Sequence, residues 1–280
     1  MPAIPTKLAD YYKKGSFGIY VGAGLSRASG LPDWESFLNE LIGYACDNNY
    51  IIQKKKKELN KLTKDPSNYL LVAEELKEIL SSDLPKFIRQ KFDSKSLVPS
   101  TTLCKVVQLN HKFIVTTNYD TLIEKAYAKV YHDILNPLTY KSASAINYNI
   151  LANEPFLLKA HGDAKSAPNE IILTENDYRN IIFKERGYQS VLHVLFSTCN
   201  VLFLGASLKD PEMKLLLGYI HNIFHGGSPS HYALINKNEI TPTEIDRWRK
   251  DFNINVITYD PKDNHQELEV FVDNLLAINN

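Results

Sequence analysis

The sequence predicts an α/β fold built on an open, mostly parallel sheet with helices on both faces and a small helical insertion. Short apolar runs alternate with helical patterns along most of the chain, which is typical of a parallel sheet with helical crossovers. The runs are apolar at consecutive positions, as strands covered by helices on both faces should be. Between residues 34 and 109 no such run occurs, and apolar side chains recur at helical spacing instead.

Composition limits the organisation and the partners of the chain. A length of 280 residues is enough for one large core, so we expect a single domain over residues 1–280 with a helical subdomain inserted at 34–109. The 32 Lys and Arg residues balance the 32 Asp and Glu residues, so no net charge favours binding to nucleic acid or to an anionic membrane. No apolar run has the length of a membrane span, and Met1–Asp10 lacks a signal-peptide core.

The three cysteines, Cys46, Cys104 and Cys199, are far apart in the sequence. Their spacing forms neither a zinc-binding pattern nor a disulfide framework. Together with the lack of a signal-peptide core, this predicts a cytoplasmic protein whose cysteines are reduced and lie in the core.

The first predicted strand, Phe17–Val21, ends at a glycine turn. A short polar lead-in with some helix precedes the strand, over residues 1–16. Gly22-Ala23-Gly24 follows at once, and the first helix of the insertion is expected at Trp34–Cys46. Asp65-Pro66-Ser67-Asn68 interrupts the helical pattern of the insertion and is a plausible cap between two of its helices.

Beyond the insertion, strands and helices alternate to the end of the chain. The predicted strands are Phe113–Val115, Phe156–Lys159, Val201–Leu204, Tyr232–Asn236 and Ile254–Thr258. The predicted helices are Thr121–Val130, Asp210–Phe224, Thr243–Asp251 and Gln266–Ile278. A further helix is predicted to begin at a cap formed by Thr174 or Asn176 and to continue through Phe196. The stretch Tyr131–Asn153 is polar and irregular and contains Pro137, so we predict a loop there.

The glycine turn after the first strand is a candidate phosphate site. Glycine has no Cβ, so a phosphate can approach the backbone amides of Gly22-Ala23-Gly24 closely. The signal is weak alone, because Arg27 occupies the position where a full dinucleotide fingerprint has its third glycine. No glycine-rich loop ending in Lys-Ser or Lys-Thr is present, which argues against a P-loop. A tight turn without a ligand is an equally good interpretation of this stretch.

Small or polar residues end each strand of the predicted sheet. In an open, Rossmann-like parallel sheet, ligands bind beyond the carboxyl ends of the strands, so these residues would face one crevice. Each has a simpler explanation alone, because Asn118 could cap a helix, His161 could be a structural histidine and residues 205–207 could form a turn. Their joint occurrence predicts a ligand site at Gly22-Ala23-Gly24, Thr117-Asn118, His161-Gly162, Gly205-Ala206-Ser207, Asn236 and Tyr259-Asp260.

Five short motifs resemble those of the sirtuin family, in the same order and at similar spacing. The resemblance extends from Gly18 to about Asp260, and the joint pattern is specific although each motif alone is not. The motifs are Gly22-Ala23-Gly24-Leu25-Ser26 with Gly30-Leu31-Pro32-Asp33, Thr117-Asn118-Tyr119-Asp120, His161-Gly162, Gly205-Ala206-Ser207 and Asn236.

Departures from the deacetylase pattern narrow the resemblance. Deacetylase sirtuins carry a four-cysteine zinc module shortly after the His-Gly motif, whereas here only the short polar segment Asp163–Glu170 precedes the next apolar run. No acyl-peptide-binding stretch is recognisable, Trp34-Glu35 replaces Phe-Arg, and Tyr119 replaces isoleucine. These departures argue against protein deacetylation. The helical insertion, Asn118-Tyr119-Asp120 and His161-Gly162-Asp163 are similar to the divergent bacterial sirtuin-like domains that hydrolyse NAD in antiphage defence.

The resemblance implies that NAD is the substrate and that no metal takes part. His161 would be the general base, Asn118 would position the ribose hydroxyls or the attacking water, and Asp120 would contact the carboxamide. The amides from Gly22 to Ser26 would hold the pyrophosphate. The residues expected to bind NAD are Gly22, Ala23, Gly24, Ser26, Asp33, Tyr119, Gly205, Ser207, Asn236 and Asp260.

Three functions remain open at this point. The first is hydrolysis of NAD to nicotinamide and ADP-ribose by the effector of an abortive-infection system. The second is transfer chemistry, by an NAD-dependent protein deacylase or an ADP-ribosyltransferase, and the third is non-catalytic sensing of NAD or ADP-ribose. Because an unrestrained NAD hydrolase would kill its own cell, we expect control through homo-oligomerisation or through a separate sensor or regulatory protein. The helical insertion is the expected contact surface.

Overall fold

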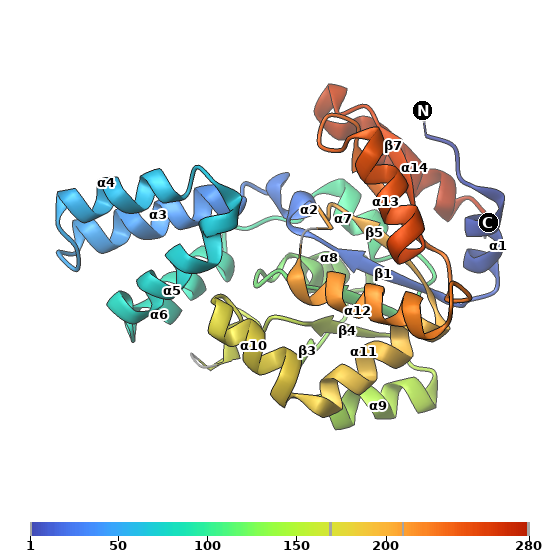
Figure 1. Cartoon of the computed structure of the whole chain (residues 1–280). Coiled ribbons are helices and arrows are strands. Elements are labelled where there is room, and N and C mark those ends of the chain that lie inside the picture. Colours follow the sequence, from blue (N-terminus) through green and yellow to red (C-terminus); the bar gives the residue numbers. More distant parts are fainter. Residues whose placement is uncertain (1, 168–169, 209, 279–280) are drawn as a thin grey trace.

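Seven strands form one parallel sheet at the centre of the molecule (Figure 1). The structure is a computed structural model, and it describes residues 2–167, 170–208 and 210–278. The strand order is β3-β4-β2-β1-β5-β6-β7, and every neighbouring pair is parallel, which confirms the predicted sheet. The strands are β1 Phe17–Val21, β2 Phe113–Thr116, β3 Leu138–Thr139, β4 Phe156–Lys159, β5 Asn200–Leu204, β6 His231–Asn236 and β7 Ile254–Tyr259.

The register makes the four central strands end level with one another. Val21 at the end of β1 lies opposite Thr116 of β2 and Leu204 of β5. Thr116 in turn lies opposite Lys159, the last residue of β4. The loops that follow these four strands therefore start side by side, at the edge where ligands bind in sheets of this kind.

Apolar side chains fill both faces of the sheet. Alternate residues of a strand point to opposite faces, so Ile19 belongs to one core cluster and Tyr20 to the other. The first face is covered by α1 (Thr6–Lys13), α8 (Leu122–Tyr131), α14 (Lys262–Leu276) and helices of the insertion. The second is covered by α9 (Ala143–Ala152), α10 (Glu175–Lys184), α11 (Arg186–Thr198), α12 (Pro211–Ile223) and α13 (Pro242–Phe252). No helix in the described ranges is long and apolar enough to cross a membrane.

The regular elements between residues 34 and 109 are all helices, as the apolar spacing predicts. They are α3 Trp34–Asp47, α4 Gln53–Leu62, the 3-10 helix η1 Pro66–Asn68, α5 Tyr69–Leu80, α6 Asp83–Phe92 and α7 Thr101–Val106. Asp65 caps η1 by accepting a hydrogen bond from the backbone N–H of Ser67. Figure 1 shows α3 to α6 extending beyond the sheet, while their apolar faces join the core cluster of its first face.

The prediction of a loop over Tyr131–Asn153 is wrong. This segment contains the short edge strand β3 and the helix α9. Ile146 is the buried side chain of α9, whereas Tyr148 and Leu151 are exposed. The helix therefore lacks the apolar stripe by which a sequence reveals a helix, and a strand of two residues is too short to show a pattern.

The single helix predicted to continue through Phe196 is two helices. The helices α10 and α11 meet at Glu185, where the backbone leaves helical geometry. Thr174 rather than Asn176 caps α10, and it forms a capping box with Asp177.

The sequence does not predict the short helix α2 (Ala23–Arg27). This helix starts directly after Gly22, so the glycine turn is its first part, and five residues are too few to show an apolar period. The helix α14 opens with residues 263–265 at positive φ, so its regular part begins at Gln266, as predicted.

The loops after β1 and β5 touch through their backbones. A Cβ atom on Gly22 would lie 2.4 Å from the carbonyl oxygen of Gly205 and 2.5 Å from the Cα atom of Ala206. Gly205 has a φ of +63°, and a Cβ atom there would meet the backbone nitrogen of Leu25 at 2.6 Å. No side chain fits between the two loops, so both positions require glycine.

We predict opposite effects on stability for two glycine-to-alanine substitutions. Gly22→Ala should lower the free energy of unfolding by about 1–3 kcal/mol, because the added methyl group overpacks the contact between the loops. Gly43→Ala should raise it by about 0.5–1 kcal/mol, because Gly43 lies inside α3 with open space around it. Urea unfolding followed by circular dichroism measures both values. A Gly22→Ala protein as stable as the wild type would contradict the contact.

Candidate functional site

Backbone hydrogen bonds hold the loop after β1 against the loop after β5. The N–H of Gly22 donates to the carbonyl oxygen of Leu204 (2.9 Å), and the N–H of Gly24 donates to that of Gly205 (2.8 Å). Two of the amides expected to hold a phosphate therefore already have partners inside the protein. Ala23 and Gly24 are exposed, so the loop presents backbone without bulky side chains.

Ser26, Asn118 and Asp120 form one hydrogen-bonded group. The Ser26 hydroxyl donates to Asp120 Oδ2 (2.8 Å), and Asn118 Nδ2 donates to Ser26 Oγ (3.0 Å). Asp120 is buried, and its other oxygen accepts the N–H of Leu122 (3.0 Å). Burial raises the pKa of Asp120 above its usual value, and the hydrogen bonds from Ser26 and Leu122 offset this only in part. The structure thus brings together three predicted site residues, of which Asn118 is the partly exposed one.

His161 lies just beyond β4 and is almost fully enclosed, with 2% of its surface exposed. Its Nε2 atom lies 3.5 Å from Glu212 Oε2 and 3.7 Å from Asp210 Oδ2. Gly162 follows with a φ of +87°, and a Cβ atom there would meet the carbonyl oxygen of Glu170 at 2.4 Å. The backbone therefore requires glycine directly after the histidine.

The two carboxylates beside His161 determine its charge. Burial alone lowers the pKa of the imidazole, because it disfavours the charged form. The negative charges of Asp210 and Glu212 outweigh burial, so the pKa of His161 lies above its ordinary value of 6.5. The histidine is therefore protonated to a higher pH than a free imidazole.

Sequence reasoning misses Asp210 and Glu212 as members of the site. The motif Asp210-Pro211-Glu212 predicts only the start of a helix, and Asp210 does cap α12. The helix follows β5, which β1 and β2 separate from β4 in the sheet, so the sequence does not place these acids beside His161. The signal that could have found them is a pair of acids at the carboxyl end of a central strand, the same edge as the histidine.

Lys159, the last residue of β4, is fully buried and links two loops of the site. Its ammonium group donates to the carbonyl oxygen of Asp120 (2.7 Å) and forms ion pairs with Glu124 (2.6 Å) and Asp163. Burial alone would lower the pKa of Lys159, but the two carboxylates outweigh it and raise the pKa. The lysine is therefore charged, and it joins the loop after β2 to the loop after β4.

Three further predicted residues lie in different surroundings. Tyr119 is buried, and its hydroxyl donates to the carbonyl oxygen of Ile172 (2.6 Å). Asp33 caps α3 by accepting the N–H of Ser36 (2.9 Å), and this hydrogen bond lowers the pKa of Asp33. Ser207 is exposed just beyond β5. The first two residues therefore support the surrounding structure, and Ser207 faces solvent.

Asn236 ends β6 and Asp260 follows β7, the two strands at the opposite edge of the sheet from β3 and β4. Asn236 Nδ2 donates to Glu239 Oε1 (3.1 Å), and Asp260 pairs with Lys237 (2.6 Å). Within the described ranges, no hydrogen bond or ion pair joins either residue to His161, Asp210 or Glu212, so the six strand ends do not form one contact network.

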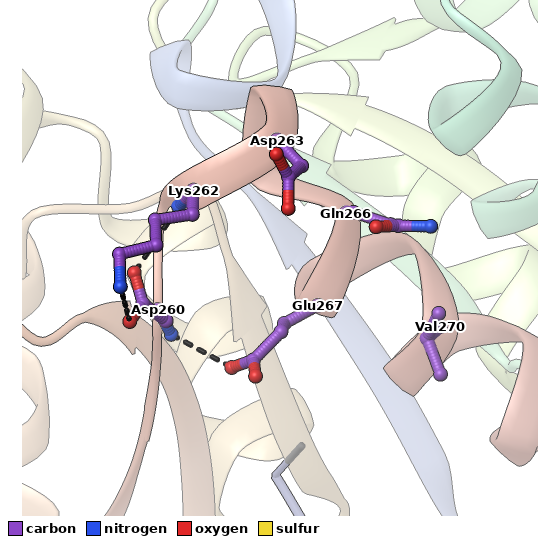
Figure 2. Close-up of a pocket in the computed structure, with 6 residues that line it drawn as sticks. All are labelled: Asp260, Lys262, Asp263, Gln266, Glu267 and Val270. Carbon is purple, nitrogen blue, oxygen red and sulfur yellow. Dashed lines mark hydrogen bonds and ion pairs between the residues drawn. The ribbon is translucent and has the colours of Figure 1, made fainter.

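A pocket of about 280 Å³ lies beside the end of β7. The residues that line it, drawn in Figure 2, are Asp260, Lys262, Asp263, Gln266, Glu267 and Val270.

His161, Asp210 and Glu212 are also residue types that bind metals, and their ligand-type atoms lie within 4.8 Å of one another. Both oxygens of each carboxylate also accept hydrogen bonds from protein groups, which hold the two acids beside the histidine.

Replacement of Lys159 should reduce stability far more than replacement of an exposed lysine. Lys159→Met leaves the buried Asp163 and the partly buried Glu124 without a counter-charge, and we expect the free energy of unfolding to fall by about 3–5 kcal/mol. Lys64→Met removes a surface ion pair with Glu35 and should leave stability nearly unchanged. Chemical denaturation monitored by tryptophan fluorescence measures both variants, and equal stability of the two would contradict the buried network.

A sequence profile for the SIR2-like domain matches residues 112–257, just over half of the chain. The matched stretch runs from the start of β2 into β7 and contains Asn118, His161 and Asp210. It therefore includes the three predicted catalytic residues, Asn118, Asp120 and His161, and both acids beside the histidine.

Three relatives of known name match between 49% and 82% of the chain. The NAD(+) hydrolase ThsA of Enterococcus faecium is 25% identical over 82% of this chain and 45% of its own length. The NAD(+) hydrolase ThsA of Bacillus cereus (strain MSX-D12) is 29% identical over 49% of this chain and 30% of its own. The defense-associated sirtuin 2 of Bacillus subtilis is 23% identical over 78% of this chain and 20% of its own. The chain thus spans less than half the length of each of these relatives.

A solved structure shares the fold. The structure of Sir2Tm bound to a propionylated peptide superposes with a TM-score of 0.50 and covers 97% of this chain and 96% of that one. The sequence identity is 11%, so the likeness concerns the fold alone. It confirms the sirtuin-like α/β architecture that the motifs predict.

Proposed function

The chain belongs to the family of SIR2-like domains, and from that membership we propose that it is an NAD glycohydrolase that releases nicotinamide and ADP-ribose. The observation that carries the proposal is the presence of Asn118 and His161 at the ends of the adjacent strands β2 and β4, at the same edge of the sheet as an exposed glycine loop. Relatives that match most of this chain are named NAD(+) hydrolases, which supports the same chemistry. A module that only binds NAD has no need of a histidine paired with acids.

Hydrolysis of NAD breaks the bond between nicotinamide and the anomeric carbon of the ribose, through a transition state with oxocarbenium character. Nicotinamide leaves as a neutral molecule, so no strong general acid is needed. Water forms the new C–O bond, and its proton passes to a base. Neutral His161 is that base in our proposal, and Asn118 orients the ribose hydroxyls or the water.

Asp120 supports Asn118 in this proposal. Both carboxylate oxygens of Asp120 accept hydrogen bonds, from Ser26 and from the N–H of Leu122. Ser26 in turn accepts a hydrogen bond from Asn118, so the buried acid fixes the orientation of the amide through the serine. Direct contact between Asp120 and the nicotinamide carboxamide stays a prediction of the family resemblance.

The rest of NAD would extend along the sheet edge. The diphosphate would lie over Ala23 and Gly24, where exposed backbone without large side chains permits close approach. The strand order β1-β5-β6-β7 then leads to Asn236 and Asp260, which are candidates for the adenosine side. Their distance from His161 in the sheet suits a dinucleotide, which binds across several strand ends.

We predict that the protein releases nicotinamide from NAD without a second substrate. His161→Gln and Asn118→Ala should each reduce the rate by about 10²- to 10⁴-fold, the usual loss when a general base or its partner is removed. His225→Gln is the matched control, because His225 is exposed beyond α12 and should keep full activity. Chromatography of the products, with thermal unfolding as a check on folding, measures the effect.

The same assay separates the three functional classes. Nicotinamide release only in the presence of an acylated peptide would show a deacylase, and transfer of ADP-ribose to protein would show a transferase. Binding of NAD without turnover would show a sensor. Full activity of His161→Gln would overturn the proposed mechanism.

We further propose that this activity serves antiphage defence, in line with the name of the Bacillus subtilis relative, and that contacts on the insertion control it. The insertion joins the glycine loop directly, because Asp33 caps its first helix and the N–H of Leu31 donates to the carbonyl oxygen of Ser26 (3.3 Å). A shift of α3 would therefore move the segment that closes over the substrate. Ile52 and Leu71 expose apolar surface on the insertion to a second copy or to another protein.

If contacts on the insertion activate the enzyme, its specific activity should depend on protein concentration or on a co-expressed partner. The expected result is a fall in specific activity on dilution, because the second copy or the partner binds the active arrangement more tightly than the resting one. Ile52→Glu and Leu71→Glu should abolish this dependence without preventing NAD binding. Constant high specific activity of a monomer at nanomolar concentration would contradict control by association.

A further inference from the structure

Two carboxylates approach His161 from the start of α12. Glu212 is 1% exposed, and its Oε2 atom lies 3.5 Å from Nε2 of the imidazole. Asp210 caps the helix and places Oδ2 at 3.7 Å from the same nitrogen. Neither contact has the geometry of a good hydrogen bond, and Nε2 is a buried nitrogen without a hydrogen-bond partner among the described residues. The main interaction between the ring and the two acids is therefore electrostatic.

Protein donors fix both acids in place. The Tyr178 hydroxyl donates to Asp210 Oδ2 (2.8 Å), and the N–H of Met213 donates to Asp210 Oδ1 (3.0 Å). Gln189 Nε2 donates to Glu212 Oε1 (2.6 Å), and the Tyr188 hydroxyl donates to Glu212 Oε2 (3.3 Å). These donors come from α10, α11 and α12, so the arrangement of the acids is set by tertiary packing before any ligand binds.

No other basic side chain in the described ranges forms an ion pair with these acids. Burying Glu212 and partly burying Asp210 costs stability unless a counter-charge is present, and the imidazolium form of His161 is the available one. The His161 and Tyr178 rings also pack edge to face, at 5.1 Å between centroids. The titratable groups that interact with the histidine or with its two acids are Tyr20 from β1, Tyr119 after β2, Tyr178 from α10 and Tyr188 from α11.

We infer that Asp210 and Glu212 are positioning residues that hold the ring of His161 and favour its charged, imidazolium form. A charged imidazole cannot accept the proton of a water molecule, so the fraction of His161 that can act as a base increases with pH. Burial raises the pKa of Tyr20, Tyr178 and Tyr188 well above the usual range, so these tyrosines stay neutral while the histidine titrates. The effect of the two acids on the charge of His161 follows from their distances to the ring, whereas the role of His161 in NAD cleavage rests on the proposed function.

The pH dependence has a definite sign. As pH rises through the pKa of His161, the imidazole becomes neutral and can act as base, so the rate of NAD cleavage should rise with pH over this range. Removing one acid removes a charge that favours the imidazolium. The pKa should then fall by about one to three units, which moves the rise in activity to lower pH.

Histidine NMR tests the charge directly. The Cε1–Hε1 signals of the eight histidines are followed against pH, and the signal lost in His161→Gln assigns His161. We expect a wild-type midpoint above 6.5 that shifts down by about one to three pH units in Asp210→Asn and in Glu212→Gln. Both substitutions keep side-chain length and one of the two acceptor oxygens. Asp65→Asn is the matched control, because Asp65 is also a helix cap but lies in the insertion, and it should leave the midpoint unchanged.

The rate of nicotinamide release against pH is the second measurement. The same shift to lower pH in both acid variants, but not in Asp65→Asn, is the result that a merely structural role would not produce. If the wild type releases no nicotinamide, the proposed function fails, while the NMR midpoints still decide the effect of the acids. If Glu212→Gln does not fold, Asp210→Asn alone decides.

Two results would overturn the inference. The first is a His161 midpoint that stays the same in both acid variants. The second is a metal ion bound in a one-to-one ratio, whose removal by a chelator changes the His161 signal, because the acids would then serve the metal rather than the histidine.

Discussion

The site depends on one buried cation, the ammonium group of Lys159. It lies at the end of β4 and binds the backbone of Asp120 and the carboxylates of Glu124 and Asp163. Without it, the buried Asp163 and the partly buried Glu124 would lack a counter-charge, and the loops after β2 and β4 would lose their common anchor. Asn118 and His161 belong to these two loops, so the fully buried lysine helps to set the position of one catalytic candidate relative to the other.

A second constraint is the absence of side chains where loops cross. Gly22 and Gly205 let the loops after β1 and β5 meet backbone to backbone, and Gly162 lets the chain turn sharply after His161. These three positions explain why glycine recurs at the strand ends. The glycine loop is thus a structural junction as well as a candidate phosphate site, since two of its amides bond to the neighbouring loop.

The chemistry of the site comes from opposing effects on one imidazole. Burial disfavours the charged form of His161, and the acids at the start of α12 favour it more strongly. The charge of the histidine therefore depends on two acids that are remote in sequence. Tyrosines from neighbouring helices hold these acids by hydrogen bonds. The charge of His161 therefore responds to any change that moves α12 or neutralises an acid.

The sequence alone determined the parallel sheet, its helical insertion and the residues at the ends of its central strands, because apolar runs and breakers are local signals. It did not determine α9, whose single buried residue leaves no stripe, or the division of the predicted helix at Glu185. Only the tertiary structure placed Asp210 and Glu212 against His161. Strand order decides which loops meet, and no local pattern in the sequence shows that β1 and β2 lie between β5 and β4. Burial, and with it the charge of His161, is likewise a property of the packed chain, since a pKa depends on neighbours that only folding brings together.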